Sequence, residues 1–258
     1  MLIRLRSVFA GLPPATNRLR RRGRAVAVVV LFLGGSCQFM PGYVAPKEPV
    51  RPAVDIRGRR VAVVPVTIPD DLELDEARVR RVESLIEAAM RDAGYDVIPA
   101  VRYEAIWDRL SEEAGGFFDP FTGHRDEALF SAAVDQLYRE MEQEYHPGAY
   151  LYGTVVVAEA MVDDGYAQWD RVALPYPLWT LDDPILALSL EVVVEDSSRV
   201  EIFRDAVGIG VLEKPDRLDD LTMVPVADRL GSEEEVARAV ERVLAPLVRP
   251  PDSAAPSR

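Results

Sequence analysis

The chain has 258 residues, of which 48% are hydrophobic and 28% are charged, a composition typical of a folded protein and far from that of a disordered chain. About 58 residues at the front and about 8 at the back read as non-globular, which leaves one domain of roughly 190 residues. The net charge is -13, and removing the seven arginines that precede Cys37 leaves 23 basic against 43 acidic residues. Such an acidic chain repels phosphate backbones, which argues against nucleic acid as a partner.

The front of the chain has the three-part pattern of an export signal. Arginines within residues 18–24 precede an apolar stretch, residues 25–33, and the small residues 34–36 lead to Cys37, the only cysteine. This apolar stretch is too short for a membrane-spanning helix, which needs about 20 residues, but it fits the core of a signal peptide. We therefore expect residues 1–36 to be a signal peptide and the domain to be exported.

The lone cysteine indicates how the exported chain is attached to the membrane. A single thiol in an oxidising compartment forms no internal disulfide, so another role for Cys37 is expected. Residues 34–37 resemble the lipobox of bacterial lipoproteins, in which the cysteine is lipidated and becomes the first residue of the mature chain. The resemblance implies that acylated Cys37 binds membrane lipid, and Gln38 after it implies the outer membrane, facing the periplasm. Ordinary secretory cleavage after Ser36 stays open, because Gly34 and Ser36 also satisfy the small-x-small rule.

The segment after the cysteine reads as a spacer. Residues 37–58 contain four prolines and little apolar periodicity. An extended chain rises about 3.1 Å per residue, so this tether reaches at most about 65 Å. We expect a single α/β domain over residues 59–249 and a disordered tail over residues 250–258.

The domain begins with a strand, a helix and a second strand. Residues 61–66 form a continuous apolar run that predicts a strand buried on both faces. Residues 75–92 carry an apolar stripe at helical spacing, closed by Gly94. Residues 95–98 predict the second strand. Such a βαβ unit makes the two strands parallel.

The middle of the domain predicts two more helices and a long strand. Apolar side chains at helical spacing mark helices around residues 103–110 and 129–141, and residues 150–162 are rich in strand-forming side chains. Residues 163–184, with three prolines and several acidic residues, read as an extended irregular connection.

The end of the domain predicts a hairpin and a closing helix. Residues 186–194 alternate with period two, residues 196–198 supply a turn, and residues 200–212 return as the second strand. Ser232 and Glu235 form a capping box before the last helix. The expected fold class is α/β (α+β): a mixed sheet of about five strands with a βαβ start, a C-terminal hairpin and about four packing helices.

Three short stretches carry a resemblance to known envelope domains. The element order is similar to that of the small α/β domain shared by the curli-secretion lipoprotein, the N-terminal domain of the Tol-associated propeller protein and the lipoprotein activators of penicillin-binding proteins. The matching stretches are residues 61–66, 94–95 and 150–154. Other stretches resemble uncharacterised proteobacterial lipoproteins, namely residues 118–123, 169–170 and 187–190. The resemblance implies a binding or assembly module without catalytic residues.

The sequence offers little for catalysis or for a cofactor. His124 and His146 are the only histidines, and their spacing favours surface or capping roles over a zinc site. Phosphate-loop, dinucleotide and nucleophile-elbow motifs are absent from the sequence. Paired aspartates in predicted loops lack the apolar pocket that raises the pKa of a catalytic acid. These pairs are Asp70–Asp71, Asp163–Asp164, Asp182–Asp183 and Asp219–Asp220. We expect no cofactor and no metal.

Four aromatic side chains cluster in the predicted connection: Tyr166, Trp169, Tyr176 and Trp179. Aromatic residues are enriched at binding hot spots, but they also pack long loops onto sheets. If the connection is a partner surface, Trp169 and Trp179 should both be partly exposed.

The leading hypothesis is a membrane-anchored lipoprotein that acts as a non-catalytic protein-binding module in cell-envelope assembly, secretion or wall synthesis. An envelope hydrolase that uses loop carboxylates is one alternative, and a subunit of a secretion pore is another. The partner would be an unidentified envelope protein, and the sequence leaves the oligomeric state open.

Overall fold

The computed structural model describes residues 56, 58–69, 72–119, 121–216 and 220–248. The expected signal peptide, Cys37, nearly all of the tether and the tail lie outside the described residues. In chain order the elements are β1 (Arg60–Val63), α1 (Glu76–Asp92), β2 (Asp96–Ile98), α2 (Ala100–Glu113), α3 (Glu127–Tyr145), β3 (Ala149–Asp163), β4 (Tyr166–Trp169), β5 (Val172–Pro175), β6 (Ile185–Asp196), β7 (Glu201–Val211), β8 (Glu213–Pro215), β9 (Leu221–Met223), the 3₁₀ helix η2 (Val226–Asp228) and α4 (Glu233–Val248).

The main sheet has seven strands and mixes parallel with antiparallel pairs. β1 pairs in parallel with β2 and with the start of β3, through Val61↔Val97 and Val61↔Ala149. β3 also pairs antiparallel with β6, which pairs antiparallel with β7. Because β3 is 15 residues long, it continues past β1 and pairs with β4, which in turn pairs with β5. β8 and β9 form a separate two-stranded sheet.

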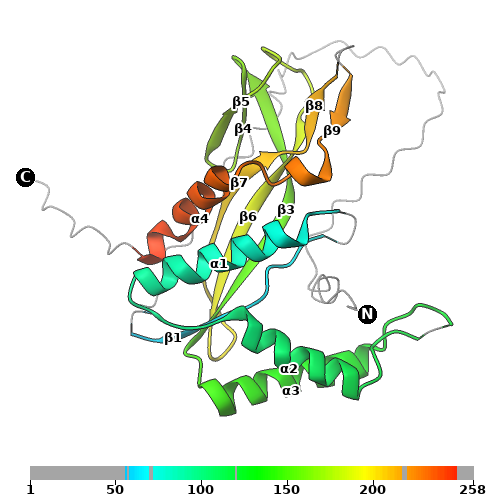
Figure 1. The fold of residues 1–258 in the computed structure, drawn as a ribbon, viewed down its shortest axis with the longest axis vertical. Coiled ribbons are helices and arrows are strands. Elements are labelled where there is room, and N and C mark those ends of the chain that lie inside the picture. Colours follow the sequence, from blue (N-terminus) through cyan, green and yellow to red (C-terminus); the bar gives the residue numbers. More distant parts are fainter. Residues whose placement is uncertain (1–55, 57, 70–71, 120, 217–219, 249–258) are drawn as a thin grey trace, which may run out of the picture.

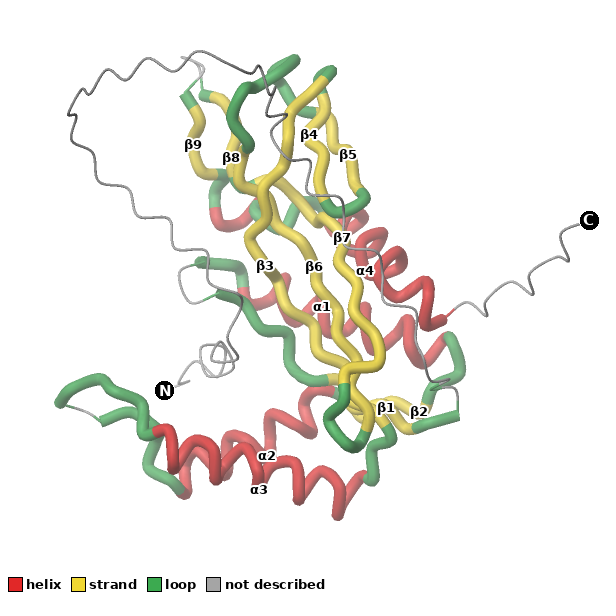
Figure 2. Tube along the Cα trace, turned by 180° about the vertical axis from the view of Figure 1, so that it is seen from behind, coloured by secondary structure: helices red, strands yellow, loops and turns green. Residues whose placement is uncertain are grey.

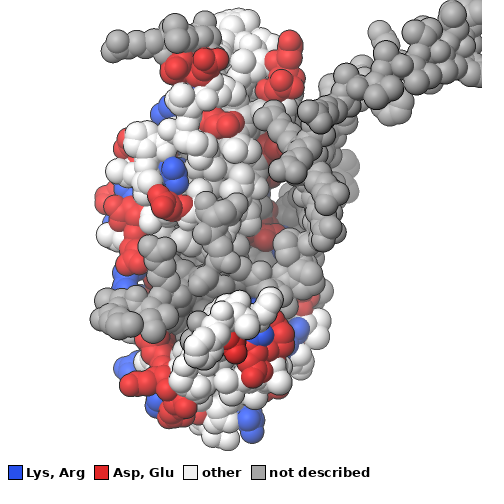
Figure 3. Space-filling view, turned by 90° about the vertical axis from the view of Figure 1, so that its right-hand side faces the viewer, with Lys and Arg blue, Asp and Glu red and all other residues white. Residues whose placement is uncertain are grey.

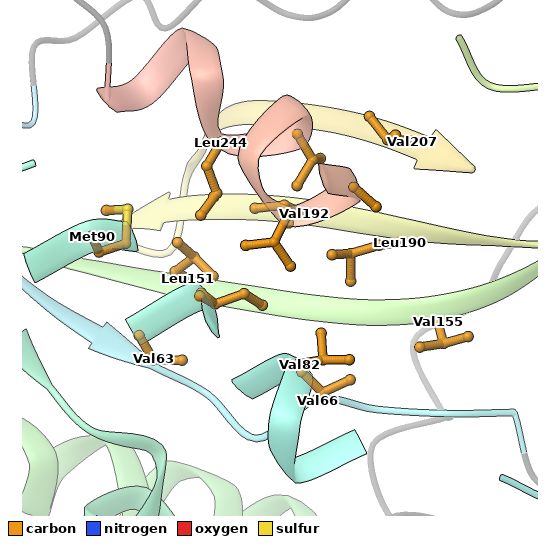
Figure 4. Close-up of a cluster of buried hydrophobic side chains, with 14 of the residues drawn as sticks. Val63, Val66, Val82, Met90, Leu151, Val155, Leu190, Val192, Val207 and Leu244 are labelled. Atoms are coloured by element: carbon orange, nitrogen blue, oxygen red, sulfur yellow. The ribbon is translucent and has the colours of Figure 1, made fainter. Parts of the chain in front are cut away.

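Helices cover the two faces of the sheet unequally. α1 and α4 lie on the front face, which carries Leu151, Leu190 and Val192 (Figure 1). Figure 4 shows Met90 of α1 and Leu244 of α4 beside these strand side chains. α2 and α3 pack on the back face, at the end of the sheet where β1 and β2 lie (Figure 2). Full burial of such aliphatic side chains stabilises the fold by about 1.5–3 kcal/mol each.

Local sequence signals account for the ends of the helices. Asp75 caps α1 by accepting hydrogen bonds from two backbone N–H groups. The expected capping box is present before α4: the Ser232 N–H donates to Glu235, and the Glu235 N–H donates to the Ser232 hydroxyl. α3 ends at His146, whose left-handed backbone (φ 50°) lets its N–H reach the carbonyl of Glu142. The capping role expected for His146 is therefore confirmed through its backbone.

The predicted fold class is confirmed, with two corrections. The parallel βαβ start and the β6–β7 hairpin are present as expected. The sheet has seven strands where about five were expected. The difference lies in residues 163–184, which are not an irregular connection, because they contain the hairpin β4–β5. This hairpin carries the residues that the sequence marked as a candidate surface.

Candidate functional site

The far end of the sheet extends beyond α1 and α4 as an arm (Figure 1). We define the arm as residues 157–187, which comprise the last part of β3, β4, β5 and the first residues of β6. Its strands are joined by Met161↔Gln168, Tyr166↔Pro175 and Ala160↔Ile185. The arm is therefore a continuation of the main sheet, and its alternate side chains point to opposite sides.

The inner side of the arm, which continues the back face, is fully packed. Ala160, Val162, Ala167 and Ile185 are buried there in a hydrophobic cluster of their own. Tyr176 covers these side chains, since its ring is buried in the same cluster and its hydroxyl donates to the carbonyl of Glu213 at 3.2 Å. Burial raises the pKa of Tyr176, and the nearby Glu213 adds to the rise, so the hydroxyl stays protonated.

The outer side of the arm, which continues the front face, is partly exposed among the described residues. Val157, Met161, Tyr166 and Leu186 lie on this side, with 36–46% of their surface exposed. In Figure 1 neither α1 nor α4 reaches over these strands. The strands of the arm thus have one packed side and one apolar side that no described helix covers.

Trp169 fixes the inner side of the arm to the edge of the sheet. Its indole Nε1 donates to the carbonyl of Leu188 at 3.1 Å. The ring lies over Gly208 of β7, where an added Cβ would approach Trp169 Cε2 to 2.5 Å and Val172 Cγ2 to 2.2 Å. Glycine is therefore required at this position by close approach of the hairpin.

Polar groups in the turn between β4 and β5 also hold the hairpin against β6 and β7. Asp170 and Arg171 both have left-handed backbones, with φ 29° and 63°. The carboxylate of Asp170 accepts from the Ser189 hydroxyl at 2.5 Å, and its carbonyl accepts from the Gly208 N–H. Arg171 forms an ion pair with Asp205 at 2.6 Å, and the Asp205 side chain is almost completely buried. Burial raises the pKa of Asp205, and Arg171 opposes the rise.

The structure divides the four predicted aromatic residues into two pairs. Trp169 is 7% exposed and Tyr176 is also buried, so these two residues pack, and the exposure that a partner surface would require is not met at Trp169. Trp179 is 72% exposed, and Tyr166 is exposed on the outer side. The ring of Trp179 lies beside the β3–β4 turn, within 3.8 Å of the Cβ position at Gly165. The positions of the four aromatic residues in the sequence did not indicate which of them pack and which are exposed.

Charge on the arm is almost all negative. Five of its acidic side chains are exposed, while its only basic side chain, Arg171, pairs with Asp205. The exposed acids are Glu159, Asp163, Asp164, Asp182 and Asp183. Figure 3 shows more acidic than basic side chains at this end of the molecule. The outer side therefore combines apolar with acidic side chains, since Glu159 lies between Val157 and Met161 and opposite Leu186.

A group of tyrosines between α2, α3 and β3 was not marked by the sequence. The hydroxyls of Tyr138 and Tyr152 lie 2.7 Å apart, and the Tyr138 ring meets Tyr103 and Tyr150 edge to face at 6.3 and 5.1 Å. Burial raises the pKa of Tyr103, Tyr150 and Tyr152, so their hydroxyls remain neutral. The alternation of Tyr150 and Tyr152 in β3 was the available signal, because it places both rings on the back face.

The other sequence candidates do not form a reactive cluster among the described residues. His124 is exposed, and its surroundings include no group of three or more His, Cys, Asp or Glu that could hold a metal ion within the described ranges. Asp163, Asp164, Asp182 and Asp183 lie exposed on the arm, whereas Asp70, Asp71 and Asp219 are outside the described residues. None of the described helices is long and apolar enough to cross a membrane.

Comparisons with known proteins include two weak structural similarities. No protein-family model matches the chain, and no curated protein matches it. Among solved structures it is similar to the lipoprotein GNA1162 from Neisseria meningitidis, at 18% identity over 59% of this chain and 83% of that chain, with a TM-score of 0.31. It is also similar to the PelC dodecamer from Paraburkholderia phytofirmans, at 15% identity over 74% of this chain and 88% of that chain, with a TM-score of 0.34. TM-scores this low carry no argument, so the resemblance to the three envelope families stays a prediction.

Proposed function

We propose that this chain is a lipid-anchored protein of the bacterial cell envelope that binds a protein partner through the outer side of its arm, without catalysing a reaction. The observation that carries the proposal is the difference between the two sides of the arm. Val157, Met161 and Leu186 are exposed on strands whose opposite side chains are fully packed. The arm is held in place by its inner side, and among the described residues no helix or strand covers the outer side.

The composition of the outer side suits a protein interface. Tyrosine, methionine and other large apolar side chains are enriched at the centre of protein interfaces, and charged side chains are depleted there. Glu159 lies between Val157 and Met161 and opposite Leu186, and Asp163 follows on the same side of β3. These carboxylates would attract a partner whose apolar surface also carries basic groups. This charge pattern would speed association more than it would strengthen the complex.

The proposed location depends on Cys37 and on the tether. Acylation of Cys37 would anchor the chain, since each buried methylene contributes about 0.8 kcal/mol and two acyl chains suffice for stable attachment. The tether would then allow the arm to work up to about 65 Å from the lipid. Changing Cys37 to Ser should move the protein from the membrane fraction to the soluble periplasmic fraction and abolish palmitate labelling. A variant that still pellets with membranes and incorporates palmitate would contradict the lipid anchor.

The binding surface is tested by site-specific crosslinking in cells. A photoreactive amino acid placed at Met161 or Leu186 should give an adduct with one and the same partner protein, whereas placement at Arg80, exposed on α1, should not. Mass spectrometry of the adduct identifies the partner, and binding of that purified partner to the full chain then gives the affinity. Equal adducts from Arg80, or none from the arm while the protein remains membrane-bound, would overturn the proposal.

A further inference from the structure

A concave site lies away from the arm, between α3 and the turn that joins β6 to β7. It is a hollow of about 390 Å³. The lining side chains are Tyr138, Arg139, Glu142, Tyr150, Ser197 and Arg199. A volume of this size falls in the range of pockets for small ligands. Two walls of the hollow carry arginines, in a protein whose overall charge is strongly negative.

The backbone conformation of Arg199 is the first indication that its side chain has a functional role. Its φ of 62° is left-handed, a conformation in which glycine or asparagine is favoured. The turn is tightly bonded around it: the Asp196 carboxylate accepts from the N–H groups of Ser198 and Val200, and the Arg199 N–H donates to the Asp196 carbonyl at 2.9 Å. An arginine where glycine would be less strained is an outlier of the kind that collects at functional sites.

The guanidinium of Arg199 is held in position by an aromatic ring. Its Cζ lies 4.0 Å from the centroid of Tyr138, in a cation–π contact. Tyr138 in turn is fixed by its hydrogen bond to Tyr152 and by its edge-to-face contact with Tyr150. The nearest acidic partner, Asp135, is 3.8 Å from Nη1, which is too long for a hydrogen bond. The planar group is thus oriented at the hollow before any ligand arrives.

The remaining groups define the chemistry of a ligand. Arg139 donates its Nε–H to the carbonyl of Asp135 at 3.3 Å, which leaves its terminal N–H groups for a ligand. Together with the guanidinium of Arg199 they match the two oxygens of a carboxylate. The hydroxyls of Tyr150 and Ser197 can donate as well, and burial raises the pKa of Tyr150 so that its proton is retained. Glu142 is the only carboxylate among the lining residues, and it can accept a hydrogen bond from the ligand.

We propose that this hollow binds a small carboxylate that carries a hydroxyl or an amine on the adjacent carbon. The carboxylate lies between Arg139 and Arg199, and the adjacent hydroxyl or amine donates to Glu142. The site is independent of the arm and of the partner proposed for it.

The test is a titration of the full chain, in detergent solution, with lactate and with alanine, followed by ligand-observed NMR. Both probes should bind, and lactamide, which lacks the carboxylate, should not. Changing Arg199 to Gly should weaken binding by about tenfold to a hundredfold, because hydrogen bonds to a charged group are lost. The melting temperature should stay within about 2 °C, since glycine relieves the left-handed backbone.

Three further variants test which side chains hold the ligand. Arg139→Gln, on the exposed side of α3, should weaken binding in the same direction, whereas Arg80→Gln on α1 should leave it unchanged. Glu142→Gln should lower the affinity for alanine more than that for acetate. Unchanged binding in both Arg199→Gly and Arg139→Gln would overturn the proposal. Equal binding of lactamide or of inorganic phosphate would overturn it too, because the hollow would then not select a carboxylate.

Discussion

Trp169 and Trp179 are ten residues apart in one hairpin region, and they have opposite surroundings. Trp169 is buried over Gly208 with its indole N–H bonded to a backbone carbonyl. Trp179 is exposed beside the β3–β4 turn. The first holds the arm to the sheet, and the second is free to meet solvent or a partner. The comparison shows that aromatic residues close together in the sequence can divide between a packed position on a strand, as at Trp169, and an exposed position in the loop after β5, as at Trp179.

The largest expected effect on stability comes from removing each indole ring in turn. Trp169→Ala should lower the free energy of unfolding by about 3–5 kcal/mol, as expected for an emptied core site. Trp179→Ala should change it by less than about 0.5 kcal/mol. Urea unfolding of both variants, followed by circular dichroism, measures the pair. Equal losses would show that Trp179 also packs and that the two surroundings are not distinct.

A second test adds a methyl group at Gly208, where the ring of Trp169 lies over the strand. In Gly208→Ala the new Cβ would meet Trp169 and Val172 well inside van der Waals distance. Overpacking of this kind costs about 1–3 kcal/mol, and we expect the loss in the same unfolding measurement. Combined with Trp169→Ala, the same substitution should cost less, because the indole no longer occupies the space. Additive losses in the double variant would place the strain at Val172 and not at the indole.

The fold was largely predictable from the sequence, because its signals are local. The apolar run of β1, the amphipathic stripe of α1 and the capping box of α4 each indicate an element without knowledge of the rest. The hairpin β3–β4 was also signalled, since Asp164–Gly165 between these strands is a favoured hairpin turn and both residues have positive φ. The prolines at 175, 177 and 184 outweighed that signal in the sequence interpretation.

The candidate sites were less predictable, because they depend on contacts between distant residues. Nothing near Trp169 in the sequence indicates Gly208, the residue whose missing side chain makes room for the ring. The hollow beside Arg199 combines a helix with a turn more than fifty residues further along the chain. The alternation of exposed Met161 with buried Val162 could have been read from the pattern, but only after the strand was known to have one covered side.

The ion pair between Arg171 and Asp205 can be tested through the pH dependence of stability. Burial raises the pKa of Asp205 above its unfolded value of about 3.9. The stability that comes from a raised pKa is present below the unfolded pKa and is lost as pH rises through the folded pKa. Asp205→Asn removes this dependence, so the stability of wild type relative to the variant should fall from about pH 4 toward neutrality. A relative stability that rises with pH would mean that Arg171 outweighs burial and lowers the pKa.

The smallest effect on stability is expected on the outer side of the arm, where function and folding should separate. Val157→Thr and Met161→Thr keep strand-forming side chains but replace apolar surface with hydroxyls, and neither position has cover among the described residues. Each should change the free energy of unfolding by less than about 0.5 kcal/mol. If the outer side binds the partner, the pair together should reduce crosslinking from Leu186 strongly, because central apolar contacts dominate interface energies. Ser198→Ala, at the exposed β6–β7 turn, is the matched control and should leave crosslinking unchanged. Large destabilisation by the threonine pair would mean that Val157 and Met161 serve the fold, and unchanged crosslinking in a stable variant would place the partner on another surface.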